Sequence, residues 1–183
     1  FSFQIQASLS NGNSGLGGNV ITASITVLAA DSFNGTNGSG LGANWTTPTG
    51  SGAFTLSNGQ ALSNSPTSLA LFNFFNNRDA AVEAKVTIGA NQNKSGVVAR
   101  YAGTGDTNMY WGGLTRSLNR TLSADLWKSV NGVWTLLGSV PISSSTAKIR
   151  LEVVGNKQSL FVEGFLRITT YDLSLTSGTK VGI

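Results

Sequence analysis

Apolar and polar side chains alternate along most of the chain with the two-residue period of a β-strand. At the N-terminus, serine and glutamine separate the apolar residues Phe1, Phe3, Ile5, Ala7 and Leu9. Similar short segments recur to the end of the sequence, and glycine- and asparagine-rich stretches separate them. No segment shows the 3.6-residue apolar period of an amphipathic helix. The pattern therefore predicts an all-β fold.

The alternation and the turn residues between the segments locate the individual strands. We expect strands over 1–9, 20–28, 53–56, 60–62, 69–75, 81–88, 96–101, 109–114, 121–130, 133–140, 148–154 and 159–163, and a further one from 165. Asn58-Gly59 and Asn131-Gly132 favour tight type I′ hairpin turns, and Gly155-Asn156 is a third turn signal. We expect 69–75 to be a buried strand. Short strands at this spacing predict a two-sheet antiparallel β-sandwich.

Composition removes several classes of chemistry. The chain of 183 residues is 40% hydrophobic, which is enough for a core, and only 11% charged. It contains no cysteine and no histidine. Cysteine nucleophiles, Ser-His-Asp triads and imidazole or thiolate metal sites are therefore excluded.

The distribution of charge changes the expected partners. The net charge is +4, but the basic residues are scattered, so the sequence does not predict nucleic-acid binding. No apolar run is as long as a membrane-spanning helix. Residues 1–77 carry a single charged side chain, Asp31. Because such neutral, hydroxyl- and amide-rich surfaces are common in secreted and virion proteins, we expect an extracellular, cell-surface or virion-surface location.

Five segments occur in an order that resembles a known superfamily. They are DSFNG…LGANW (31–45), SGVVARY (95–101), SVNGVWTLLGS (129–139), IRLEVVGNKQSLFVEG (149–164) and YDLSLTSGTKVGI (171–183). Their order resembles the concanavalin A-like lectin/glucanase superfamily in its laminin-G-like form. The resemblance implies a jelly-roll β-sandwich over 31–183. It also implies a non-catalytic module, because many laminin-G-like modules of large surface proteins and phage tails have no enzymatic activity.

Residues 1–30 form a separate two-strand segment with its own resemblance. FSFQIQASLSNGN…GNVITASITV resembles the last two strands of a fibronectin type III domain. Members of the superfamily also carry one more strand after the segment that ends here at Ile183. The strand 1–9 could fill that place, within one chain or in the next subunit. We therefore expect partners that pair by β-strands, either other copies of the chain or neighbouring domains, and both origins of 1–30 stay open.

Aromatic side chains beside polar ones are candidates for glycan binding, because a sugar ring has an apolar face and polar edges. The main candidates are Trp127, Tyr110, Trp111 and Arg100, and further ones are Tyr101, Trp134, Asn108 and Arg116. Trp127 shares a strand face with Asp125 and Ser129, so we expect its ring to be exposed. Phe33 and Trp45 lie in the opening motif, where a core position is expected.

Carboxylates suggest two other kinds of site. Asp31 and Asp172 could bind calcium with help from Asn34, although each could instead cap a turn. Calcium is the one cofactor that the sequence suggests. The catalytic pair of a glucanase lies two positions apart on one strand, and no two acidic residues here have that spacing.

The sequence leaves three functions open. The main prediction is a non-catalytic structural or adhesive module of an extracellular or virion-surface assembly, with the N-terminal strand as a filament contact. The first alternative is a carbohydrate-binding module of a larger surface or phage tail protein. The second is a glycoside hydrolase, which the carboxylate spacing disfavours.

Overall fold

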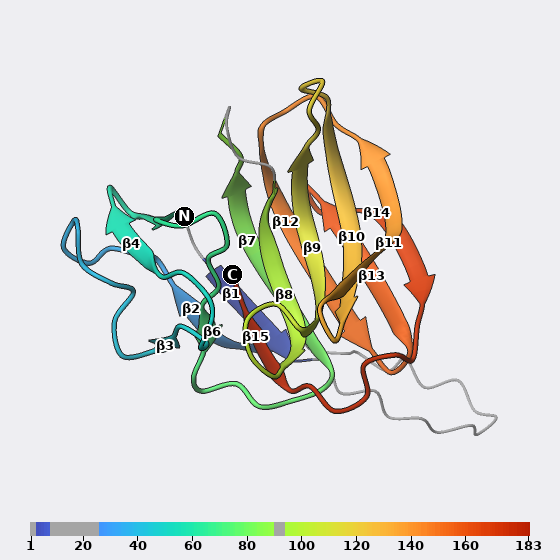
Figure 1. Cartoon of the computed structure of the whole chain (residues 1–183), viewed down its shortest axis with the longest axis horizontal. Helices are drawn as coiled ribbons and strands as arrows, with labels where there is room; N and C mark the ends of the chain where they lie inside the picture. The colour runs from blue at the N-terminus through green and yellow to red at the C-terminus, as the bar shows by residue number, and fades with distance from the viewer. Residues whose placement is uncertain (1–2, 8–25, 90–93) are drawn as a thin grey trace.

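The fold is known from a computed structural model that describes residues 3–7, 26–89 and 94–183. Every regular element in these ranges is a β-strand, which confirms the prediction of an all-β protein. None of the described residues belongs to a helix that could cross a membrane. Two large antiparallel sheets form a sandwich, and a separate hairpin lies at its side (Figure 1).

The first large sheet has six strands. Their order across the sheet is β14 (Phe165–Tyr171), β13 (Lys157–Val162), β12 (Thr146–Val154), β7 (Ala80–Thr87), β1 (Phe3–Ala7) and β2 (Thr26–Asp31). Strand β1 pairs with β7 on one side and with β2 on the other, so Phe3 lies opposite both Ala84 and Asp31. Of the expected strand 1–9, Phe1 and Leu9 lie outside the described residues, as do 20–25 of the expected second strand.

The second large sheet has seven strands. Their order is β11 (Val133–Pro141), β10 (Leu122–Val130), β9 (Asn108–Arg116), β8 (Lys94–Ala102), β15 (Lys180–Gly182), β6 (Leu71–Phe72) and β3 (Trp45–Thr46). The separate hairpin consists of β4 (Phe54–Ser57) and β5 (Gln60–Ser63). The strand β15, from the end of the chain, therefore lies between β8 and a strand from the first half of the chain.

Two hairpin turns have the geometry that their residues predict. Asn58 and Gly59 have φ values of 49° and 71°, and Asn131 and Gly132 have values of 52° and 80°. Positive φ at both central positions defines a type I′ turn, and asparagine and glycine adopt it at little cost. These turns join β4 to β5 and β10 to β11 in register.

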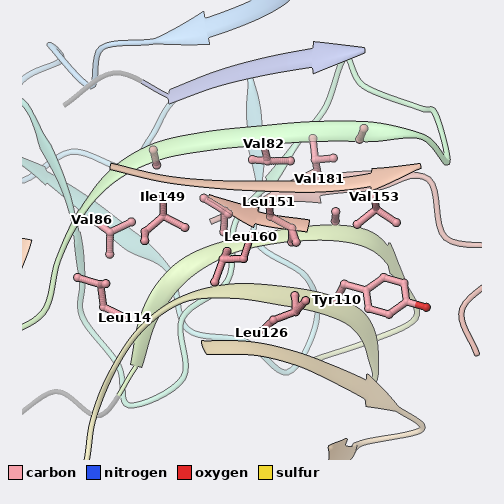
Figure 2. Close-up of a cluster of buried hydrophobic side chains, with 14 of the residues drawn as sticks. Val82, Val86, Tyr110, Leu114, Leu126, Ile149, Leu151, Val153, Leu160 and Val181 are labelled. Atoms are coloured by element: carbon pink, nitrogen blue, oxygen red, sulfur yellow. The ribbon is translucent and has the colours of Figure 1, made fainter. Parts of the chain in front are cut away.

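The core lies between the two sheets. Ile149, Leu151 and Leu160 from the six-stranded sheet and Leu114 and Leu126 from the seven-stranded sheet have no exposed surface (Figure 2). The expected core residues Phe33 and Trp45 are buried at 4% and 8% exposure. Their ring centroids are 5.8 Å apart. Because the core lies between the two sheets, the outer face of each sheet remains available for other contacts.

The segment 69–75 differs in part from the buried strand that we expected. Leu71 and Phe72 alone form a strand, and Phe74 is 77% exposed. The chain turns outward at Asn73, whose side-chain amide donates to Ala43 O at 2.7 Å and accepts a bond from Thr46 Oγ1. The regular strand ends at Phe72, and one further backbone bond, from Asn73 N–H to Asn44 O at 2.9 Å, follows it.

Candidate functional site

Three of the four tryptophans gather on the outer face of the seven-stranded sheet. Trp111 on β9 lies opposite Trp127 on β10, and Trp134 follows on β11. The rings of Trp127 and Trp134 meet edge to face, with centroids 6.5 Å apart. Both rings pack against a buried layer on this face that includes Val98, Met109 and Trp111. We call Trp111, Trp127 and Trp134 the tryptophan platform.

Two glycines form the floor beneath Trp111. Gly96 on β8 and Gly113 on β9 are paired in register. A Cβ atom would lie 2.9 Å from the Trp111 ring at Gly96 and 2.7 Å from it at Gly113. Real Cβ atoms do not approach a ring so closely. The indole of Trp111 can therefore lie against the sheet only because Gly96 and Gly113 have no side chains.

Two carboxylates fix the other two rings. Trp134 donates its indole N–H to Asp106 Oδ2 at 2.9 Å, and Trp127 donates to Asp125 Oδ2 at 3.3 Å. Asp125 is 4% exposed, and its Oδ1 accepts a bond from Ser139 Oγ at 2.6 Å. Rings held in this way lose little freedom when a ligand binds, which favours affinity.

Lys94, the first residue of β8, places its ammonium over the platform. The Nζ atom lies 3.8 Å from the ring centroid of Trp127, 4.9 Å from that of Trp134 and 5.8 Å from that of Trp111. All three distances are within the range of cation–π attraction. Burial lowers the pKa of Lys94, and the charges of Asp125 and Asp106 partly oppose that shift.

A cleft of about 1090 Å³ runs beside the platform. Lys94, Asp106, Trp111 and Trp134 line one part of it, and the hairpin β4–β5 with the segment 64–69 lines another. Drug-sized ligands bind in clefts of this size that combine apolar surface with a few polar groups. The cleft and the platform together form the candidate binding surface.

The structure places Trp127 and Trp111 on this surface, but not Tyr110 and Arg100. Tyr110 has no exposed surface and points into the core from the opposite face of β9. Arg100 is 1% exposed, and its φ of 51° interrupts the regular alternation of β8. The two side chains therefore lie inside the molecule. The ring of Trp127, which we expected to be exposed, is half-buried.

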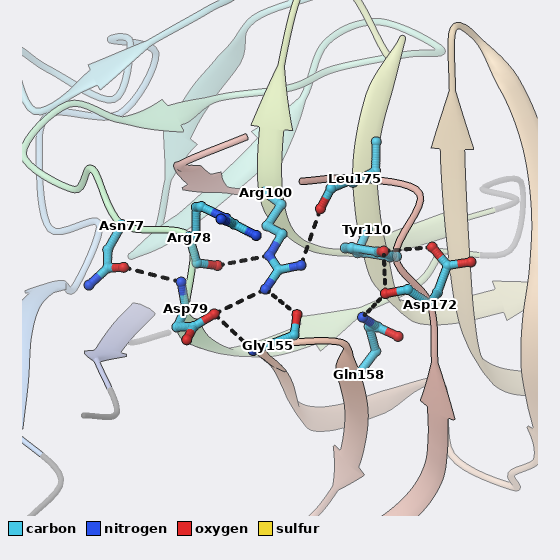
Figure 3. A network of polar contacts seen from close by, with 9 residues as sticks. All are labelled: Asn77, Arg78, Asp79, Arg100, Tyr110, Gly155, Gln158, Asp172 and Leu175. Carbon is cyan, nitrogen blue, oxygen red and sulfur yellow. Dashed lines mark hydrogen bonds and ion pairs between the residues drawn. The ribbon is translucent and has the colours of Figure 1, made fainter. Parts of the chain in front are cut away.

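The guanidinium of Arg100 joins four parts of the fold (Figure 3). It donates to Arg78 O at 3.0 Å, Leu175 O at 3.1 Å and Gly155 O at 2.6 Å, and it forms an ion pair of 3.0 Å with Asp79. A buried charge needs this degree of pairing. Its contacts are those of a structural residue.

Tyr110 and Asp172 belong to a second internal network, also drawn in Figure 3. Tyr110 OH donates to Asp172 Oδ1 at 2.7 Å, and Lys128 Nζ lies 2.5 Å from Asp172 Oδ2. Burial alone would raise the pKa of Asp172, but hydrogen bonds from Lys128, Tyr110 and Ser174 lower it to about 2. Burial and the bond to Asp172 raise the pKa of Tyr110 well above its ordinary value.

Asp31 and Asp172 do not lie together as a calcium site would require. Asp31 ends β2 and Asp172 follows β14, and these strands form opposite edges of the six-stranded sheet. Each carboxylate caps a turn instead, accepting a backbone N–H from Phe33 and from Ser174 respectively. In the described part of the chain, no three acidic side chains form a group that could hold a metal ion.

Three further residues that the sequence suggested for glycan binding are Tyr101, Asn108 and Arg116. Tyr101 lies in the buried layer of the outer face and donates its OH to Gly103 O. Asn108 Oδ1 accepts the N–H of Asn131, and Arg116 donates to Gly89 O.

Two residues of this surface, Lys94 and Asp106, are absent from the candidates that the sequence pattern indicated. Strand parity would have suggested Lys94, because Lys94, Gly96 and Val98 alternate along one face of β8. Asp106 lies in the turn between β8 and β9, where the two-residue period gives no signal.

No family model and no curated protein sequence matches this chain. Several solved structures are similar to it in fold, including the following two. The carbohydrate-binding module CBM66 from Bacillus subtilis has a TM-score of 0.62 at 16% identity, over 76% of this chain and 87% of that one. The kappa-carrageenase from Pseudoalteromonas carrageenovora, in complex with an oligotetrasaccharide of kappa-carrageenan, has a TM-score of 0.53 at 14% identity. That match covers 83% of this chain and 77% of the enzyme.

These similarities bear out the prediction of a jelly-roll-like antiparallel β-sandwich. They concern the fold, because both identities are low. The more specific resemblances to laminin-G-like modules and to fibronectin type III strands stay predictions.

Proposed function

We propose that the chain is a carbohydrate-binding β-sandwich module, of laminin-G-like type, that acts at an extracellular or virion surface. The tryptophan platform is the observation that carries this proposal. An indole offers a flat apolar surface to the face of a sugar ring, and the cleft beside it offers carboxylate, hydroxyl and ammonium groups to the hydroxyls. The likeness in fold to a carbohydrate-binding module supports the same assignment.

We propose binding without hydrolysis. Asp106 and Asp125 are the carboxylates beside the platform, and each accepts an indole N–H. A retaining glycosidase needs two carboxyl groups about 5–5.5 Å apart that face the scissile bond. Here the carboxylates orient the rings, which suits a surface that holds a glycan.

Binding to a glycan array followed by calorimetry tests the proposal. We expect saturable binding of at least one class of glycan by the full chain, and its loss in Trp127→Ala. The matched control is Phe165→Ala, which removes a ring that is 72% exposed on β14 of the other sheet. The control should bind like the unmodified protein. Absence of binding to every glycan, or equal losses in both variants, would contradict the proposal.

Strand pairing between copies is a second candidate function, and the position of β1 favours it. In the slot between β7 and β2, five residues of β1 pair with β2 and four pair with β7. A slot of this kind can take the same segment from a neighbouring copy, as in donor-strand assembly. Such exchange would give the structural or adhesive assembly that the uncharged residues Phe3, Ile5 and Ala7 suggest.

Light scattering on the full chain over a range of concentrations tests strand exchange. We expect polymers that grow with concentration, and a loss of polymer in Ile5→Pro, because proline cannot donate to the ladder. Thr46→Pro is a control that places a proline in the edge strand β3 of the other sheet. A chain that stays monomeric at every concentration would contradict exchange and leave the glycan proposal unaffected.

A further inference from the structure

The tryptophan platform already holds a protonated amine. The ammonium of Lys94 lies against three indole faces, at 3.8, 4.9 and 5.8 Å from the ring centroids. Cages of aromatic rings around a cation are a recurrent way for proteins to recognise ammonium groups. The platform therefore has the shape and the electronic character of an ammonium seat.

The charges around this seat also favour a cation. Asp106 and Asp125 face it from the β8–β9 turn and from β10, and both are close enough to act on the charge of Lys94. Tyr101 lies on the same face and is neutral at ordinary pH, and burial together with Asp106 raises its pKa further. When Lys94 moves away, two negative charges and three π-faces remain.

Lys94 is held loosely in this position. Among the residues that the structure describes, the ion pairs closer than 4 Å involve the cations of Arg100, Lys128, Lys148 and Arg150. The ammonium of Lys94 takes part in none of these pairs. Its side chain is only partly buried, and cation–π contacts at exposed sites are weak. A ligand that brings its own ammonium can therefore replace it at little cost.

We propose that the platform selects glycans that contain protonated amino sugars, such as glucosamine units, and that Lys94 occupies the ammonium seat when no ligand is bound. This inference rests on the proposed carbohydrate-binding function and specifies its ligand. The sugar ring stacks on one indole, and its amine takes the place of the Lys94 ammonium between the rings, near Asp106 and Asp125. An N-acetylated sugar has the same ring without the charge, so it cannot replace the lysine in this way.

Calorimetry with two sets of oligosaccharides tests the inference on the full chain. Glucosamine oligomers are compared with N-acetylglucosamine oligomers of the same length, below the pKa of the sugar amine. We expect the glucosamine oligomers to bind more tightly. Lys94→Ala should increase their affinity several-fold, because the competing cation is gone, and Lys148→Ala is the control, a half-exposed lysine on the six-stranded sheet.

A charge-neutral variant of the seat gives a second readout. Asp106→Asn keeps an oxygen acceptor for the indole N–H of Trp134 and removes one negative charge. We expect about three- to fivefold weaker binding of glucosamine oligomers, the change that an exposed charge pair produces. The affinity for N-acetylglucosamine oligomers should not change.

The outcomes separate this inference from the proposed function. Glycan binding that depends on Trp127 but does not prefer the charged oligomers would overturn the amino-sugar inference and leave the function standing. A loss of affinity in Lys94→Ala would also overturn it, because the lysine would then contact the ligand. Absence of any glycan binding would overturn both.

Discussion

At the scale of single residues, Arg100 shows how a charged side chain can be a structural residue. Its guanidinium is closed off from solvent and bonds to three carbonyl groups and to Asp79. The carbonyls belong to the segment before β7, the turn between β12 and β13 and the stretch that leads to β15. One side chain therefore joins both sheets and the C-terminal segment.

Replacement of Arg100 tests this role. Arg100→Met keeps much of the volume but removes the donor to three carbonyl groups and the ion-pair partner of Asp79. We expect a loss of about 3 to 5 kcal/mol in the free energy of unfolding, measured with urea. Arg167→Met, at an exposed position of β14, should change it by less than about 0.5 kcal/mol. Equal effects of the two substitutions would argue against the role.

Asp172 gives a prediction for acid stability. Its pKa in the folded protein is about 2, below the ordinary 3.8, so its contribution is complete above pH 4 and is lost as the pH falls toward 2. A shift of this size corresponds to about 2 kcal/mol. We expect Asp172→Asn to be less stable by about that amount at neutral pH and similar to the unmodified protein near pH 2. Denaturation at a series of pH values measures the difference, and a constant gap at all pH values would contradict it.

Part of the candidate site could be predicted residue by residue. Alternation on β10 places Trp127 beside Asp125, and their hydrogen bond bears this out. Tyr110 and Trp111 are neighbours on one strand and must point to opposite faces, but the sequence does not say which face is the core. The seat of Lys94 could not be predicted, because it depends on rings from three strands that come together only in the sheet.

At the scale of elements, the pair Gly96 and Gly113 determines how closely β8 and β9 approach under Trp111. A Cβ at Gly113 would lie 2.3 Å from the backbone oxygen of Ser95 as well as 2.7 Å from the indole. The backbone contact cannot be relieved by a rotamer change. The spacing of these two strands and the position of the ring are therefore coupled.

Gly113→Ala tests this coupling. We expect a loss of about 1 to 3 kcal/mol in stability from overpacking, together with weaker glycan binding because the ring of Trp111 is displaced. Thermal unfolding and calorimetry measure the two effects. Gly40→Ala is the matched control, since a Cβ there meets nothing within 4 Å. Unchanged glycan affinity in a folded Gly113→Ala protein would show that Trp111 does not contribute to binding.

The strands themselves could be predicted well where the chain alternates regularly between strong turn signals. The hairpins β4–β5 and β10–β11 are the clearest cases. Prediction is harder at register shifts, such as those between Ala99 and Ala102 and between Leu126 and Trp127. A bulge reverses the in-and-out parity of the strand residues beyond it, and nothing local in the residue pattern marks its position.

At the scale of the whole molecule, the order of strands depends on contacts that are distant in sequence. β1 lies between β7 and β2, and β15 lies between β8 and β6. Periodicity identifies segments that fit a sandwich, but it contains no information on which segment takes which place. The two-sheet architecture could therefore be predicted from the sequence, whereas the positions of the first and last strands needed the structure.

The hairpin β4–β5 is the least integrated part of the described fold. It forms its own two-stranded sheet, joined to the neighbouring loop by backbone bonds such as those between Leu56 and residues 38 and 39. Small sheets of two strands have little stability of their own. We expect its amide hydrogens to exchange orders of magnitude faster than those of β8, β9 and β12, as measured by hydrogen exchange with mass spectrometry. Equal protection of the hairpin and the central strands would contradict this.

The distribution of tryptophan gives the protein an optical property. Three of the four indoles lie on the outer face of the seven-stranded sheet beside an ammonium and two carboxylates, with Trp111 buried and Trp127 and Trp134 half-buried, whereas Trp45 lies in the core between the sheets. The intrinsic fluorescence of the folded protein therefore comes mostly from the surface where we place the ligand. Its intensity and emission wavelength should respond when Lys94 leaves the rings, while Trp45 supplies a background that changes only on unfolding. The chain thus contains its own reporter of occupancy, and no attached dye is needed to follow binding.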